Sequence, residues 1–244
     1  MRFTVSSSAL NQRLQTIRGV ITGKNTINIL DCFLFEFNGR MLTLTASDGD
    51  NRLTTQLELA EIDVDAARMC INAKTILDTL KELSDQPLIF QVDLDNGTVK
   101  GEYCNGEFNI TCQPATDYPM PPALEGDSNN VTMPSASLLA GITRCFPCTK
   151  DDEIRPQMTG IFMDNKPEAT TFVATDGHKL MRSSTKKNVT ETEHSVIIPK
   201  KSAILLKSIL AKDEGDAQVT TAGTMLIVQT TDYKLRCKLI EGRY

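Results

Sequence analysis

The chain has 244 residues, of which 40% are hydrophobic, 5% are aromatic and none is tryptophan, so its cores should consist of aliphatic residues and methionine. The formal net charge is −5, which argues against a protein that coats nucleic acid with its whole surface. No stretch approaches the roughly 18 apolar residues of a membrane span, and the opening MRFTVSSSAL lacks the apolar run of a signal peptide, so neither is expected.

The first half of the chain predicts a β-rich unit with two helices. A short strand at residues 2–5 leads into the serine triplet at 6–8, which supplies N-cap chemistry for a helix that runs to about residue 19. Apolar residues at helical spacing predict a second helix at 73–83. Alternating patterns and Asn-Gly turns predict strands at residues 29–37, 41–47, 52–59, 68–71, 88–94, 98–103 and 107–112.

The second half predicts the same order of elements. Residues 113–130 contain four prolines and a glycine with acidic residues between them, a composition that is typical of a linker. A helix is expected at 135–144, strands follow to about residue 198, and a second helix is expected at 200–211 before further strands to 239. Two helices against one extended sheet predict an α+β layer arrangement for each half.

An internal repeat relates the two halves. Residues 41–57 and 169–185 each contain an alternating strand, a Ser/Thr-Asp-Gly turn and a second alternating strand, at an offset of 128 residues. The match continues through the helices, and Asp117-Tyr118 lies near Arg243-Tyr244, with the offset drifting to 126. A repeat of about 125 residues is too long for a solenoid unit and has the length of a domain. The expected boundaries are 1–120 for the first domain, 121–130 for the linker and 131–244 for the second domain.

Cys145-Phe-Pro-Cys148 is the motif that most suggests an enzyme, a thiol oxidoreductase. A redox CxxC normally opens a helix, where the helix dipole lowers the thiol pKa, whereas this motif ends a predicted helix and contains Pro147. Two semi-buried structural thiols are therefore the favoured interpretation, and the seven cysteines favour reduced cytosolic thiols. A zinc site would need a second ligand pair, and His178 and His194 are far along the chain, so no metal or cofactor is expected.

Asp48 with Asp50, and Asp176 with His178, could form acid–base or metal-binding pairs. Asp-Gly between two alternating strands is first of all a hairpin turn, and we favour that interpretation. The chain contains no glycine-rich phosphate loop, nucleophile elbow or HExxH pattern. A catalytic function therefore has little support.

The predicted helices are biased towards basic side chains, although the chain is acidic overall. Residues 1–122 carry 10 basic and 16 acidic residues, a net charge of −6, and residues 123–244 carry 16 and 15, a net charge of +1. Basic helix faces on an acidic protein suit sequence-independent contact with DNA phosphates, and the alternative is a solvated helix surface. The basic residues concerned, on the helices or just beyond them, are Arg13, Lys74, Arg144, Lys150, Lys200, Lys201 and Lys207.

Three segments of the sequence are motif-like: VATDGHKL at 173–180, VIIPKK at 196–201 and LIEGRY at 239–244. Together with the MRFTV start, they closely resemble the bacterial replicative sliding clamps, the beta subunits of DNA polymerase III. The resemblance extends over essentially all 244 residues in order. It implies an α+β tandem repeat of DNA-clamp domains, each a curved antiparallel sheet layer with two helices on the DNA side.

Members of that family are processivity factors without catalytic activity, so the resemblance implies a protein that encircles duplex DNA without sequence preference and uses no cofactor. Two subunits of three domains each close head to tail into a homodimeric ring. The ring tethers the DNA polymerase III alpha subunit, the clamp loader and repair proteins through short linear peptides. The expected location is the cytoplasm, in association with the nucleoid. The alternative is a peptide-binding scaffold without DNA.

Positions that match the family define further candidate residues. By resemblance, Lys24 is expected to face DNA. The residues that match the partner-peptide groove are Met158, Thr175, Gly177, His178, Lys179 and Leu180. Lys179 is a mild departure, because the family usually has arginine after the histidine. The family chain normally continues for about another domain beyond the position of Tyr244, so a third domain is expected to be absent here, and this chain alone should not close a ring.

Overall fold

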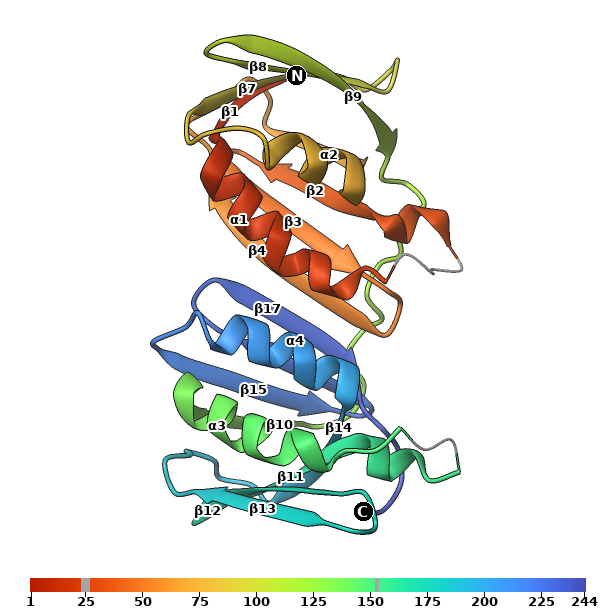
Figure 1. Cartoon of the computed structure of the whole chain (residues 1–244), viewed down its shortest axis with the longest axis vertical. Helices are drawn as coiled ribbons and strands as arrows, with labels where there is room; N and C mark the ends of the chain where they lie inside the picture. The colour runs from red at the N-terminus through yellow and green to blue at the C-terminus, as the bar shows by residue number, and fades with distance from the viewer. Residues whose placement is uncertain (23–26, 152–153) are drawn as a thin grey trace. The chain divides into compact units, whose positions relative to one another are not determined.

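The computed structural model describes residues 1–22, 27–151 and 154–244. The chain forms two compact units, Met1–Pro121 and Pro122–Tyr244. In each unit, two helices lie against antiparallel strands (Figure 1). Lys24, which we expected to face DNA, lies outside the described residues. Within the described ranges, no helix is both long and apolar enough to cross a membrane.

In the first unit, nearly every strand pairs with two antiparallel neighbours. The pairing order is β4-β3-β2-β6-β9-β8-β7-β1-β5, and β9 joins the two parts of the sheet because it pairs with both β6 and β8. The elements, in chain order, are β1 (Arg2–Ser6), α1 (Ser7–Ile17), η1 (Arg18–Val20), η2 (Asn28–Asp31), β2 (Cys32–Asn38), β3 (Met41–Ser47), β4 (Asn51–Glu58), β5 (Glu61–Ile62), β6 (Ala66–Asn72), α2 (Ala73–Leu80), β7 (Pro87–Asp93), β8 (Thr98–Tyr103) and β9 (Gly106–Pro114).

The second unit contains two runs of paired strands, β10-β15-β16-β17 and β13-β12-β11-β14, and all of these pairings are antiparallel. Its helices α3 and α4 contact each other, α3 also packs on β12 and β13, and α4 packs on β11, β14 and β17. The elements, in chain order, are β10 (Ser128–Pro134), α3 (Ser135–Cys145), η3 (Phe146–Cys148), η4 (Pro156–Thr159), β11 (Gly160–Lys166), β12 (Ala169–Thr175), β13 (Leu180–Thr185), β14 (His194–Pro199), α4 (Lys200–Leu210), β15 (Asp216–Ala222), β16 (Met225–Gln229) and β17 (Tyr233–Lys238).

The two units share one topology. The order β4-β3-β2-β6 corresponds to β13-β12-β11-β14, and β9-β8-β7-β1 corresponds to β17-β16-β15-β10. One join differs between them. In the first unit β6 pairs with β9, whereas in the second unit β14 is bonded by the chain that follows β17, where the N–H of Ile240 donates to the carbonyl of Ile197 at 3.0 Å. The expected α+β duplication is confirmed at the level of strand order.

The helices form where the sequence predicts because their signals are local. In α1, the apolar side chains Leu10, Leu14 and Ile17 are each 0% exposed, as a stripe with helical period requires. The side chain of Ser6 caps the helix by accepting a hydrogen bond from the N–H of Ala9 at 3.2 Å. The helices α3 and α4 follow Pro134 and Pro199 and have no side-chain cap of this kind.

Three details differ from the elements predicted. Residues 29–31 belong to the 3₁₀-helix η2 rather than to a strand, because Ile29 and Leu30 turn inward to pack with Tyr118. The two-residue strand β5 was not predicted, since a run so short carries no alternation. Strand β10 begins at Ser128, so residues 128–130 of the expected linker pair with β15.

Gly141 in α3 allows the helix to lie directly on β12. A Cβ atom at this position would be 2.3 Å from Cδ2 of Phe172, a buried side chain that cannot move away. In an exposed helix, Gly→Ala would stabilise by about 1 kcal/mol. Here we expect Gly141→Ala to lower the free energy of unfolding by about 1–3 kcal/mol through overpacking. Chemical denaturation checks the sign, and Gly215→Ala is the control, because the nearest atom there is at 3.4 Å.

A polar cluster with a titratable group ties β14 to β11. The Oδ1 atom of Asn165, a fully buried residue, accepts a hydrogen bond from Thr170 at 2.9 Å, which leaves the Asn165 Nδ2 group to donate to Nε2 of His194 at 3.2 Å. An accepting Nε2 requires a neutral imidazole. Burial lowers the pKa of His194 from its ordinary value, against smaller raising effects of the Thr192 backbone and the Asp164 carboxylate.

This lowered pKa predicts acid sensitivity. The unfolded chain binds a proton at His194 more readily than the folded chain does, so the stabilisation is complete above the ordinary histidine pKa and is lost as the pH falls below it. We expect the free energy of unfolding to fall between pH 7.5 and 5.5 more steeply in the natural protein than in a His194→Gln variant. Denaturation at both pH values measures this difference, and identical slopes would contradict the assignment.

Candidate peptide-binding turn and basic helices

The Ser/Thr-Asp-Gly turns of the two repeats have the same hydrogen bonds. In the second unit, Oδ1 of Asp176 accepts from the N–H groups of His178 and Lys179, both at 2.9 Å. In the first unit, Oδ1 of Asp48 accepts from the N–H groups of the corresponding Asp50 and Asn51, at 3.0 and 2.6 Å. These aspartates therefore build hairpins, as predicted. The N–H groups of Lys179 and His178 lower the pKa of Asp176, so it stays an ionised acceptor.

Glycine completes each turn. Gly177 has a φ of +87° and Gly49 has a φ of +97°, a conformation that disfavours any residue with a Cβ atom. The hydroxyl of Thr175 accepts from the N–H of Gly177 at 3.2 Å and donates to the carbonyl of Lys179 at 2.8 Å. The turn is thus fixed by its own side chains, and its outer residues are left exposed.

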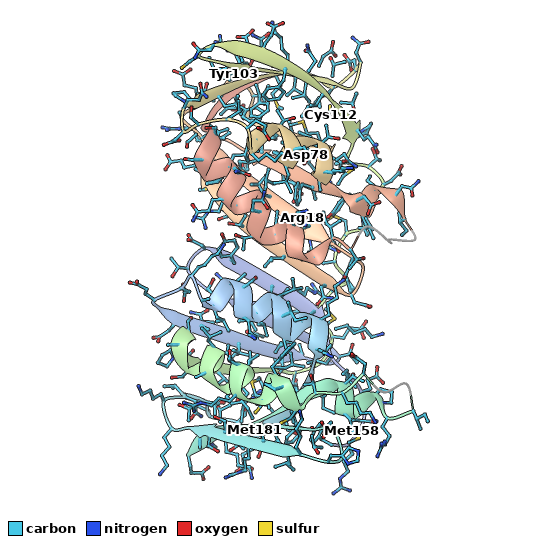
Figure 2. All side chains as sticks on the ribbon, in the orientation of Figure 1. Arg18, Asp78, Tyr103, Cys112, Met158 and Met181 are labelled. Carbon is cyan, nitrogen blue, oxygen red and sulfur yellow. The ribbon has the colours of Figure 1, made fainter. Side chains whose placement is uncertain are left out.

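The structure brings the six candidate groove residues together. Five of them lie at the end of β12, in the turn that follows it or at the start of β13: Thr175, Gly177, His178, Lys179 and Leu180. The sixth, Met158, comes from η4, and its Cε atom would be 3.5 Å from a Cβ on Gly177. Leu180 is 64% exposed, and Met181 beside it is also exposed. Figure 2 labels Met158 and Met181 in this part of the second unit.

This arrangement suits an apolar peptide side chain. Leu180 and the adaptable thioether of Met158 offer apolar surface, and Gly177 leaves backbone open to close approach. Two aromatic residues next to this site were not among the predicted residues. Phe162 and Tyr244 stack with ring centroids 5.2 Å apart, and the hydroxyl of Tyr244 accepts from the N–H of Thr175 at 2.9 Å. The repeat, which places Tyr244 near Tyr118, was the one sequence signal that could have found it.

The predicted basic residues of the first unit differ in exposure. Lys74, in the first turn of α2, is exposed, whereas Arg13 of α1 is half-buried. Arg18, which follows α1 directly, is exposed and presents its side chain at the end of the helix (Figure 2). Lys74 and Arg18 are therefore better placed than Arg13 to reach a phosphate.

In the second unit, most of the predicted basic residues already have partners. Nζ of Lys200 lies 2.9 and 2.8 Å from the two carboxylate oxygens of Asp151. The ammonium group of Lys207 lies 4.7 Å from the ring centroid of Phe146. The exposed Arg144 donates from Nη1 to the hydroxyl of Ser183 at 3.3 Å. Lys201 and Lys150 are half-buried.

The two lysines that begin α4 lie at the positive end of the helix dipole, where a cation is unfavourable. Lys200 and Lys201 occupy the first turn, which has no acidic residue and no side-chain cap. A cation at the positive end of a helix costs about 0.3–1 kcal/mol. The Asp151 carboxylate is 85% exposed, so its ion pair with Lys200 offsets little of that cost. Helix stability does not explain these lysines, which is consistent with a role in binding an anion.

The CxxC motif does not have the features of a redox site. Cys145 ends α3 and Cys148 ends η3, and both are buried free thiols. Burial, and then the neighbouring Cys148, raise the pKa of Cys145 to about 11, opposite to the lowering that a reactive thiol needs. The Cys145 thiol instead faces the carbonyl of Met181, 3.8 Å away. The Cys145 thiol thus packs α3 against β13.

Comparison with known families decides the relationship. The family model for the N-terminal domain of the DNA polymerase III beta subunit matches residues 1–122, and the model for the central domain of the same subunit matches residues 132–244. The chain belongs to the DNA polymerase III beta subunit family. The beta sliding clamps of Pseudomonas putida and Escherichia coli K12 are 24% and 25% identical to it over 100% of the chain. The chain spans 66% of the length of each of these curated relatives.

Solved structures of the beta subunit family have the same fold. The DNA polymerase III subunit beta from Pseudomonas aeruginosa, 24% identical, gives a TM-score of 0.90 over 100% of this chain and 66% of its own. A sliding clamp from the same organism bound to griselimycin, 23% identical, gives 0.92 over 100% and 66%. The Helicobacter pylori beta clamp bound to DNA ligase peptide, 21% identical, gives 0.86 over 100% and 68%. The clamp fold is therefore shared along the whole chain.

Proposed function

We propose that the protein acts as a sliding clamp, a processivity factor that encircles duplex DNA and tethers the replicative polymerase. The observation that carries this proposal is the match of its two halves, in order, to the N-terminal and central domains of the beta subunit family. The proposed assembly is a head-to-tail homodimeric ring of subunits with three clamp domains, of which residues 1–120 and 131–244 form two and residues 121–130 the linker. It performs no chemistry of its own and works in the cytoplasm, with the nucleoid.

The proposed DNA-facing surface is formed by the helices. Basic side chains make weak, sequence-independent phosphate contacts, and the closed ring keeps the protein on DNA while these contacts exchange. The acidic remainder of the surface, within a net charge of −5, discourages coating of DNA from outside. The residues proposed for this surface are Arg13, Lys24, Lys74, Arg144, Lys150, Lys200, Lys201 and Lys207.

The proposed partner site is the turn between β12 and β13 together with Met158. A Helicobacter pylori beta clamp has been solved with DNA ligase peptide and a Pseudomonas aeruginosa clamp with griselimycin, which supports ligand binding by this fold. We propose that the turn binds short linear peptides of the DNA polymerase III alpha subunit, the clamp loader and repair proteins. The residues proposed are Met158, Thr175, Gly177, His178, Lys179 and Leu180.

The decisive experiment separates a topological clamp from an ordinary DNA-binding protein. The protein from its natural gene is loaded with its clamp loader and ATP on nicked circular DNA, and its retention is compared before and after the circle is linearised. Retention on circles and loss from linear ends is expected. Equal retention on both would contradict the clamp, and binding of peptide without retention on either would favour a peptide-binding scaffold.

A further inference from the structure

The hydroxyl of Tyr244 takes the place of a ladder acceptor at the end of β12. The ladder between β11 and β12 runs from Lys166 paired with Ala169 to Phe162 paired with Val173, so Thr175 extends beyond it. The N–H of Thr175 therefore has no ladder acceptor on this side, and the Tyr244 hydroxyl accepts its hydrogen bond at 2.9 Å. One side-chain oxygen thus holds the strand end from which the candidate peptide-binding turn begins.

Tyr244 is itself held in place from several directions. Its ring stacks on Phe162 at an interplanar angle of 16°. The preceding chain is anchored by the N–H of Leu239, which donates to the Thr224 carbonyl at 2.7 Å. Gly242, with a φ of +119°, approaches Gln157 so closely that a Cβ would be 2.5 Å from Nε2. The bonding oxygen therefore has a defined position.

The turn lies between two supports. Tyr244 binds it at Thr175, and Met158 approaches it at Gly177, 3.5 Å from the site of an added Cβ. Loss of the Tyr244 hydrogen bond would leave the internal hydrogen bonds of the turn intact but would free the turn to move relative to Met158. Leu180, whose position relative to Met158 defines the apolar surface, would then move as well.

The first repeat has a tyrosine at the corresponding position, but without the hydrogen bond and without an open site. Tyr118 corresponds to Tyr244 and is 2% exposed, and the N–H of Ser47, the counterpart of Thr175, lies near its hydroxyl without completing a hydrogen bond. Where the second repeat has Leu180, the first has Arg52, whose guanidinium lies 5.5 Å from the Tyr118 ring centroid and donates to the Pro119 carbonyl at 2.8 Å. Arg52 thus covers the tyrosine in the first repeat.

We propose that Tyr244 is a positioning residue for peptide binding, and that its hydroxyl fixes the Thr175–Leu180 turn relative to Met158. The assignment rests on the peptide-binding function proposed for this turn. The ligand class is a short peptide that presents an apolar side chain to Leu180 and Met158. Tyr244 acts through Thr175 and lies behind the turn, so its effect is on the affinity that the turn provides.

The test uses Tyr244→Phe, which removes one oxygen and keeps the ring stack, and Tyr118→Phe as the matched control in the other repeat. Griselimycin, the ligand with which a Pseudomonas aeruginosa sliding clamp has been solved, is the probe. Its affinity is measured by calorimetry on the protein expressed from the complete natural gene. We expect Tyr244→Phe to weaken binding about threefold to tenfold, the usual worth of one hydrogen bond, and to speed exchange of the Thr175 amide proton. Tyr118→Phe should leave both quantities unchanged.

Three results would overturn the proposal, and they are distinguishable. If the unmodified protein does not bind griselimycin, the peptide-binding function fails and the role of Tyr244 fails with it. If the unmodified protein binds and Tyr244→Phe binds equally well, the turn keeps its function and the positioning role alone is wrong. If both phenylalanine variants weaken binding equally, in step with their free energies of unfolding, the tyrosine oxygen has only a structural role.

Discussion

Replacing Lys200, Lys201 and Lys207 together by glutamate should reduce retention on nicked circular DNA at least about tenfold at roughly 0.1 M salt. Three half-buried cations in the first and last turns of α4 become anions, so phosphate attraction turns into repulsion. Retention should also lose part of its salt dependence, because each lost phosphate contact lowers the slope of log affinity against log salt by about one. A salt titration of retention measures both effects.

The fold should not suffer from this charge reversal. Two of the three lysines oppose the dipole of α4, so glutamate at positions 200 and 201 should favour the helix by a few tenths of a kcal/mol each. The lost ion pair with Asp151 has one largely exposed partner, the carboxylate, so its loss costs about 0–1 kcal/mol. We therefore expect the free energy of unfolding to stay within about 1 kcal/mol of the natural value, while retention falls.

The matched control reverses three lysines away from the helices. Lys166, Lys234 and Lys238 are exposed. The last two belong to β17, where they alternate with buried residues and therefore lie on the exposed face of the strand. Changing these three to glutamate alters the net charge by the same amount. Retention close to that of the natural protein is expected for the control. An equal loss in both triple variants would mean that total charge, and not the helix face, governs retention.

The parts of the fold that could be predicted from the sequence are those determined by residues close together in the chain. The helix that starts at Ser7 has a serine cap and an apolar stripe within 11 residues, so its position follows from neighbours in sequence. The hairpin turns at Asp48 and Asp176 likewise depend on bonds that span four residues or fewer. The pairing of β9 with both β6 and β8 joins segments far apart in the chain, and no periodicity encodes it.

The candidate site was predictable in part for the same reason. The turn from Thr175 to Leu180 forms from its own residues, whereas its assignment to a peptide groove, and that of Met158, came from the family resemblance. The bond between Tyr244 and Thr175 spans 69 residues, and the pair of Lys200 with Asp151 spans 49. Contacts of that separation depend on how β-strands are ordered, so a sequence that predicts each element correctly still leaves such partners undetermined.

The second large effect should come from Leu180→Asp, which we expect to weaken griselimycin binding at least about thirtyfold. Burying a leucine side chain against a ligand contributes about 1.5–3 kcal/mol of binding free energy. A carboxylate in its place would lose its hydration on binding, which costs further free energy because an apolar ligand offers it no cation. The substitution should leave the fold intact, because Leu180 is 64% exposed and its backbone pairs with Thr175 whatever the side chain. Calorimetry gives the affinity, and thermal unfolding confirms the fold.

Val189→Asp is the control for this change, because Val189 is 71% exposed, lies in the same unit and is outside the turn. It removes an exposed apolar side chain and adds the same charge, so it should leave griselimycin affinity within about twofold, as expected of an ordinary surface position. Equal weakening by Leu180→Asp and Val189→Asp would show that added negative charge repels the ligand. Unchanged affinity in Leu180→Asp would place the peptide site elsewhere, because no ligand that packs on Leu180 can tolerate a buried carboxylate there.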